Sequence, residues 1–256
     1  MEFDKSKVKW MKGWMDLPEA YFRIKTPSVT TIINDSIDDP GLEEWIKAVG
    51  EEKAAQITKA AQERGTSMHI FIEEFLKSYK ESHDPSKALR HTQIQSPKLL
   101  EEEGIPKEKV SIGRDLFYNF YESDYANSLL EIIGTELPIY SPSLFYRGKA
   151  DAVYKLMGIA VSDFKTINKP IEKGSIKEKK YKLQLGGYAL GLEHMYNQKK
   201  DVNVSINYAS IISMHTKSEM VFVTECKDQE LQKYKDEFEN LCIEWHKSNC
   251  QSFLFS

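Results

Sequence analysis

The stretch YRGKADAVYKLMGIAVSDFKT, residues 146–166, decides the fold of this chain. Both of its halves are rich in β-forming residues, and Met157-Gly158 between them is a turn signal, so it predicts a tight hairpin. If the turn centres on Met157, residues equally far on either side pair with each other, and Asp151 faces Asp163. Their Cβ atoms would then lie about 5 Å apart. Lys165 projects from the same face as Asp163, because side chains alternate along a strand.

Two carboxylates this close repel each other unless a cation lies between them. Their neighbours are mostly Ala, Val and Phe, which indicates an interior hairpin rather than an exposed one. Carboxylate oxygens are the ligands that Mg²⁺ and Mn²⁺ prefer. A lysine beside such an ion could orient or deprotonate a bound water, or balance developing charge. The competing interpretation is a pair of solvent-exposed acids in which Lys165 only neutralises Asp163.

Composition indicates a soluble chain with a substantial core, since 41% of its 256 residues are hydrophobic and 29% are charged. No apolar run approaches the ~20 residues that a membrane span needs, so no membrane contact is expected. The N-terminal segment carries Glu2, Asp4, Asp16 and Glu19 and only one arginine, Arg23, so it resembles neither a secretory signal nor an Arg-rich transit peptide. The three cysteines cluster near the C-terminus and fit a reducing compartment. We therefore expect a cytoplasmic protein of a bacterium or a phage-infected cell.

The whole chain, residues 1–256, is predicted to form one α/β domain. Residues 1–133 are a helical N-terminal portion, with helices expected near 28–33, 40–49, 51–79 and 108–131. Residues 81–107 contain several Pro, Gly and Ser and are predicted to be a long loop or lid. Residues 134–256 are expected to hold the catalytic sheet and a C-terminal helix. Strands are predicted at about 134–140, 143–156, 159–166, 203–214 and 219–225, with a helix at about 179–197.

Three further features are candidates for a site. Gln184 and Tyr188 are four residues apart, which places both on one face of a helix, and Gly186-Gly187 between them would let another backbone or a ligand approach closely. Glu136 precedes the hairpin on the strand before it. Five lysines within residues 173–182, Lys179, Lys180 and Lys182 among them, favour phosphate binding, although the net charge of −4 opposes a nucleic-acid partner over the whole chain.

Taken together, these residues resemble the RecB-type branch of the PD-(D/E)XK nuclease superfamily, in particular the mitochondrial genome maintenance exonuclease group and related phage exonucleases. The resemblance covers residues from about 27 to 250. Its pieces, in chain order, are Pro27-Ser28-Val29-Thr30, Arg64-Gly65 with His69, Glu136, Gly148 with Asp151, Asp163 with Lys165-Thr166, and Gln184 with Tyr188.

The resemblance implies a restriction-endonuclease-like core, in which a mixed central β-sheet is flanked by helices, with N-terminal helices that form an arch over a single strand. It also implies a role for each residue. Metal binding falls to Asp151, Asp163, the Phe164 carbonyl and His69. Lys165 is the catalytic lysine, and Glu136 supports the metal site. Contacts to DNA fall to Gln184, Tyr188, Ser28 and Thr30.

One departure from the family concerns cysteine. Several RecB-type relatives hold an iron–sulfur cluster with four cysteines, one of them near the N-terminus. This chain has three, Cys226, Cys242 and Cys250, so no iron–sulfur cluster is expected.

The sequence therefore predicts a Mg²⁺- or Mn²⁺-dependent deoxyribonuclease, an exonuclease that prefers single-stranded DNA or free ends. Its expected setting is DNA recombination, repair or degradation, with a recombination or single-strand-binding protein as a further partner. Two alternatives stay open. One is a structure- or site-specific endonuclease of the same fold. The other is a non-catalytic, DNA-end-binding recombination scaffold whose acids merely pair with lysines.

Overall fold

The computed structural model describes residues 26–128, 131–197 and 203–253 of the chain. Its centre is a five-stranded sheet with the strands side by side in sequence order: β1 (Glu131–Ser141), β2 (Tyr146–Lys155), β3 (Ile159–Ile167), β4 (Ile206–His215) and β5 (Val221–Lys227). Adjacent strands are antiparallel except β3 and β4, which run parallel. A parallel pair needs a long crossover, which α8 (Ile176–Asn197) supplies. The predicted mixed sheet is confirmed.

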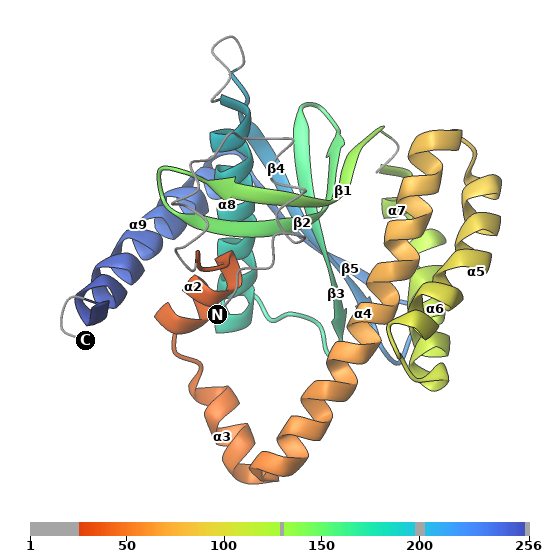
Figure 1. Ribbon diagram of the computed structural model, residues 1–256, viewed down its shortest axis with the longest axis horizontal. Helices are drawn as coiled ribbons and strands as arrows, with labels where there is room; N and C mark the ends of the chain where they lie inside the picture. Colours follow the sequence, from red (N-terminus) through yellow and green to blue (C-terminus); the bar gives the residue numbers. More distant parts are fainter. Residues whose placement is uncertain (1–25, 129–130, 198–202, 254–256) are drawn as a thin grey trace.

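Helices cover both faces of this sheet (Figure 1). On one face lie α8, α9 (Asp228–Phe253) and α2 (Val29–Ser36), and on the other lie α4 (Glu51–Ser82), α5 (Pro85–Glu102), α6 (Lys107–Tyr121) and α7 (Asp124–Ser128). A buried core fills the space on each side. Val153 and Val161 belong to the core on the α8 side, whereas Tyr154 and Ala160 belong to the core on the α4 side. Because side chains alternate between the two faces of the sheet, β2 and β3 each contribute residues to both cores.

The predicted hairpin is β2–β3. Ala152 pairs with Ser162 and Lys155 with Ile159, which is the register expected for a turn centred on Met157. Met157 is 100% exposed at the tip of the hairpin. Asp151 and Asp163 come one step beyond the last of these pairs, at the opposite end of the hairpin from its turn.

The prediction of a long loop at residues 81–107 is wrong, because most of this segment forms α5. Asp84 caps the helix by accepting hydrogen bonds from the backbone N–H groups of Ser86 and Lys87. Pro85 occupies the first turn, where its missing N–H leaves no bond unmade. The buried face repeats every four residues: Ala88, Thr92, Ser96 and Leu100. Two of these four are polar, so the helical period is hidden from a search for apolar residues.

Other boundaries differ less. The helix expected over 108–131 ends at Tyr121 and is followed by the short α7, and β1 begins at Glu131 rather than at 134. α3 (Pro40–Val49) has the predicted bounds and begins after its N-cap Asp39. It has no buried residue and joins α2 to α4 at one end of the molecule (Figure 1). Residues 1–25 of the predicted domain lie outside the described residues. Among the described residues, no helix combines the length and the apolar character needed to cross a bilayer.

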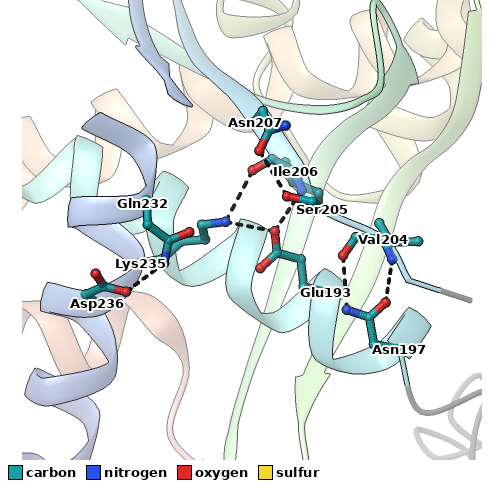
Figure 2. A network of polar contacts seen from close by, with 9 residues as sticks. All are labelled: Glu193, Asn197, Val204, Ser205, Ile206, Asn207, Gln232, Lys235 and Asp236. Carbon is teal, nitrogen blue, oxygen red and sulfur yellow. Dashed lines mark hydrogen bonds and ion pairs between the residues drawn. The ribbon is translucent and has the colours of Figure 1, made fainter. Parts of the chain in front are cut away.

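A buried ion pair joins α8, α9 and β4 (Figure 2). Lys235 of α9 is 3% exposed, and its Nζ lies 2.8 Å from Glu193 Oε1 of α8. The same carboxylate oxygen accepts a hydrogen bond from Ile206 N at 2.7 Å, and Lys235 Nζ donates to Ile206 O at 3.3 Å. Since β4 pairs with β3, this network fixes the helix that carries Gln184 relative to the strand that carries Asp163.

Candidate active site

A cavity of about 1040 Å³ lies between α4 and the end of the β2–β3 hairpin. Residues from α2, α4, β1, β2, β3 and α8 line it. The structure brings together at this cavity nearly all residues that the sequence predicted for a site: Ser28, Thr30, His69, Glu136, Asp151, Asp163, Phe164, Lys165, Gln184 and Tyr188. Only the three predicted lysines of α8 are outside it.

The two aspartates are buried, with 9% of Asp151 and 2% of Asp163 exposed. Asp151 Oδ2 accepts a hydrogen bond from Phe164 N at 2.7 Å, across the hairpin. Asp163 Oδ1 accepts one from Gln184 Nε2 at 2.8 Å. Asp163 Oδ2 forms an ion pair with Lys165 Nζ at 2.5 Å. Asp151 is thus held by the hairpin backbone, and Asp163 by a helix and a neighbouring cation.

Burial raises the pKa of Asp151 well above its usual value, and the nearby Asp163 carboxylate raises it further. Lys165 and the Phe164 N–H oppose this rise without cancelling it. A buried carboxyl group of this kind binds a proton when no other cation is near it. A divalent cation at the same place would favour the ionised form instead.

Asp151 belongs to a group of three residues whose ligand atoms converge. One atom each from His69, Glu136 and Asp151 lie within 4.8 Å of one another, and His69 Nδ1 is 3.4 Å from Asp151 Oδ2. Burial lowers the pKa of His69, so the ring is neutral at neutral pH, the form in which imidazole binds metals. Two carboxylates and a neutral imidazole, together with the raised pKa of Asp151, fit a divalent cation. Asp163 is outside this group, so its role as a ligand stays a prediction.

Glu136 reaches this group through an unusual backbone conformation. Thr135 pairs with Ala152 and Leu137 with Ala150, which places Glu136 opposite Asp151. Its φ of 48° lies in the left-handed region, which costs a residue other than glycine about 1–2 kcal/mol. Such strain concentrates at functional sites. The Glu136 carboxylate forms an ion pair with Lys149.

Gln184 and Tyr188 approach the hairpin from α8. Gln184 Nε2 lies 2.8 Å from Tyr188 Oη as well as from Asp163 Oδ1. The Tyr188 ring fits against Gly148, where an added Cβ would lie 2.9 Å from the ring. A glycine at 148 therefore lets the tyrosine, and with it the glutamine amide, come close to the sheet. The prediction that α8 has close backbone neighbours is also confirmed, since a Cβ on Gly186 would lie 2.5 Å from the carbonyl oxygen of Tyr234 in α9.

Lys165 is a cation in this setting. Burial by itself lowers the pKa of its amine, but the carboxylates of Asp163 and Asp151 outweigh burial and raise the pKa above its usual value. The Nζ also lies 5.8 Å from the centre of the Tyr181 ring, a favourable position for a cation. The amine therefore holds its proton at neutral pH.

The lysines predicted to bind DNA lie elsewhere. Lys182 lies outside the cavity, and its side chain is buried with Nζ 3.0 Å from Glu178 and 2.7 Å from Glu230, so its contact with DNA stays a prediction. Lys179 and Lys180 also lie outside the cavity and pair with acids, Glu237 at 2.6 Å and Asp39 at 3.6 Å. Glu178 lies within the run of lysines, but Glu230, Glu237 and Asp39 are distant in sequence, so the run did not show these three partners.

Ser28 lines the cavity but already has a structural task. Its Oγ accepts a hydrogen bond from Thr31 N at 3.0 Å and caps α2. The hydroxyl of Thr30 lies 3.0 Å from the same Oγ. Their contact with DNA stays a prediction.

Sequence reasoning missed several residues that line the cavity. Gln62, Thr66 and Glu73 lie on the face of α4 that carries His69, at spacings of three and four. Arg147 and Lys149 lie on the face of β2 that carries Asp151. Both sets could have been found by extending the helical period from His69 and the strand period from Asp151.

The family model of the PD-(D/E)XK nuclease superfamily matches residues 19–252. This match is to the superfamily as a whole, so the RecB-type branch stays a prediction. No curated protein matches the sequence.

Two solved structures are similar. One is named "Putative exonuclease" and comes from Eubacterium rectale. Its identity to this chain is 14%, its TM-score is 0.38, and the match covers 64% of this chain and 62% of that one. The chain thus spans less than two thirds of that protein. The other is SSO0001, with 14% identity, a TM-score of 0.28, and coverage of 69% of this chain and 74% of that one. The family match covers most of the sequence, and the chain belongs to the PD-(D/E)XK nuclease superfamily.

Proposed function

We propose that this protein is a Mg²⁺- or Mn²⁺-dependent deoxyribonuclease that hydrolyses phosphodiester bonds. One observation carries the proposal: the ligand atoms of His69, Glu136 and Asp151 converge in a cavity that Lys165 also lines. This combines a site for a divalent cation with a fixed ammonium group, in a space lined by polar side chains.

The charge of the cavity supports metal dependence. Its lining contains four carboxylates (Glu73, Glu136, Asp151 and Asp163) and three cations (Arg147, Lys149 and Lys165), a formal charge of −1. Protonation of Asp151 in the absence of a metal brings this charge to zero. The metal-free cavity therefore does not attract an anionic phosphodiester, whether Asp151 is ionised or protonated. One divalent cation would change the charge to +1 and make the cavity attractive to DNA.

Each residue has a definite task in this proposal. His69, Glu136 and Asp151 would hold the cation, with Asp163 and the Phe164 carbonyl as further ligands. A bound divalent ion polarises a phosphoryl oxygen and lowers the pKa of bound water. Lys165, which retains its proton, stabilises negative charge as it develops on the phosphate. Gln184 fixes the orientation of Asp163, and Gln184 and Tyr188 position the scissile strand.

The preference for single-stranded DNA or free ends is the finer part of the proposal. It rests on the family resemblance of the sequence motifs. Such an exonuclease would serve DNA recombination, repair or degradation in the cytoplasm of a bacterium or phage-infected cell, beside single-strand-binding or recombination proteins.

The test uses end-labelled single- and double-stranded DNA with either end blocked, incubated with Mn²⁺ or with EDTA. We expect degradation from a free end in Mn²⁺ and none in EDTA. Lys165→Ala should lose about 10²–10³-fold in rate, as when one preorganised charge donor is removed. A matched control is Lys155→Ala, an exposed lysine on β2 outside the cavity, which should retain full activity. Full activity of Lys165→Ala would refute the role of the lysine.

A covalently closed single-stranded circle separates the exonuclease from an endonuclease of the same fold, because only the endonuclease would cut it. The non-catalytic scaffold has one structural argument in its favour: Asp163 pairs with Lys165, and Glu136 pairs with Lys149. Binding of DNA ends with no cleavage in either Mn²⁺ or Mg²⁺ would support that alternative.

A further inference from the structure

Three cationic side chains line the cavity, and they differ in their partners. Lys165 lies against Asp163, and Lys149 forms an ion pair with Glu136. Arg147 is exposed, and among residues 26–128, 131–197 and 203–253 its guanidinium group has no carboxylate partner. Arg147 is therefore the cation of this cavity whose charge is still available to a ligand.

The backbone of Arg147 is firmly placed even though its side chain is free. Arg147 N donates a hydrogen bond to Pro27 O at 2.9 Å, and Arg147 forms a parallel β-bridge with Ser28, which also lines the cavity. On the opposite edge it pairs with Tyr140 of β1. A guanidinium on such a fixed base loses less freedom on binding than one on a mobile loop.

The order of charged residues along β2 shows where Arg147 lies relative to the metal-binding group. Asp151, Lys149 and Arg147 follow one another on one strand face, and the strand rise of about 3.3 Å per residue puts Arg147 about 13 Å from Asp151 between Cα atoms. Lys149 lies between them and is neutralised by Glu136. Arg147 is thus displaced along the sheet from the metal-binding group, at the rim of the same cavity.

We infer that Arg147 binds a backbone phosphate of the DNA strand other than the scissile one, and so holds the strand in register across the site. This inference rests on the proposed nuclease function. A planar guanidinium matches the two free oxygens of a phosphodiester. Contacts of this kind position a nucleic acid without reading its sequence.

The test measures how binding of a fluorescent single-stranded oligonucleotide depends on salt. Ca²⁺ replaces Mn²⁺, and a gel confirms that the strand stays intact. Each phosphate contact on a single strand contributes about 0.7 to the slope of log K against log salt. Arg147→Ala should therefore lower the slope by about 0.7 and weaken binding about fivefold at 0.1 M salt, equally for strands of different sequence. Arg147→Lys should restore most of the slope, since it retains the charge.

Lys155→Ala is the control, because it removes one positive charge from the same strand outside the cavity. It should leave the slope unchanged. Arg147→Gln is a second neutral variant, of similar length, and its melting temperature verifies the fold. Slopes for Arg147→Ala and Arg147→Gln equal to that of the unaltered protein would overturn the inference and leave the nuclease proposal standing. Failure of the unaltered protein to bind or cut any strand would overturn both.

Discussion

At the residue scale, Asp151 is a proposed metal ligand whose ionised form destabilises the metal-free protein. It is buried beside Asp163, and its pKa is raised well above the usual value by burial and by that second carboxylate. A carboxyl group whose pKa is higher in the folded than in the unfolded protein favours folding least when it is ionised. Without a metal, the contribution of Asp151 to stability therefore falls as pH rises above about 3.8 through its folded pKa.

Asp151→Asn removes this conflict while keeping an oxygen that can accept the hydrogen bond of Phe164 N. We expect the variant to unfold at a higher temperature than the unaltered protein in EDTA at pH 8, and the difference to shrink as pH is lowered. It should also lose the stabilisation given by Mn²⁺. Thermal unfolding at several pH values, with and without Mn²⁺, measures both effects. A less stable variant in EDTA at pH 8 would contradict the assigned repulsion.

At the element scale, α8 is placed by close contact on more than one side. It packs on the sheet and on α9, and a Cβ on Gly186 would lie 2.5 Å from Tyr234 O, a backbone atom that has little room to yield. Gly65 in α4 is the opposite case, since nothing lies within 4 Å of where its Cβ would be. Alanine substitutions at these two helical glycines therefore give a matched comparison of a crowded and an open position.

Gly186→Ala should destabilise the protein by about 1–3 kcal/mol, the usual cost of overpacking. Gly65→Ala should stabilise it by up to about 1 kcal/mol, because alanine is the better helix former. Urea unfolding of both variants in EDTA gives the two free energies. Equal effects of the two substitutions would show that α8 and α9 do not approach as closely as described.

At the scale of the whole molecule, metal binding should stabilise the fold, because its ligands come from α4, β1 and β2. These elements are brought together only in the folded chain. Mn²⁺ at 100 times its dissociation constant should add about 2.7 kcal/mol. For a protein of this size that raises the melting temperature by about 5–10 °C. Differential scanning calorimetry in Mn²⁺ and in EDTA tests this, with His69→Ala as the variant that should respond least.

Much of the site could be predicted because it lies in local sequence. The turn at Met157-Gly158 sets the hairpin register, and the register in turn places Asp151 and Asp163 together. The nearness of Gln184 to Asp163 could be predicted only through the family resemblance, since it depends on how α8 crosses the sheet.

The structure departs from sequence-based expectation where long-range partners or polar core residues decide it. Lys182 is neutralised by Glu230, which is 48 residues further along the chain. The face of α5 is built on Thr92 and Ser96, which a search for apolar periodicity passes over. Thr92 can be buried because its hydroxyl donates to Ala88 O within the same helix at 2.9 Å.

The exposed tip of the β2–β3 hairpin makes few contacts, but the length of its turn sets the register of the two strands. Met157 could be exchanged for almost any residue, yet the length of the loop is under strict control. Inserting a single amino acid there would slide one strand against the other and turn Asp163 and Lys165 toward the opposite layer of helices. A second inserted residue would return them to their own side, displaced along the strand. In homologous sequences that keep this chemistry, the amino acids at the tip should therefore vary, whereas the number of residues in the turn should seldom change.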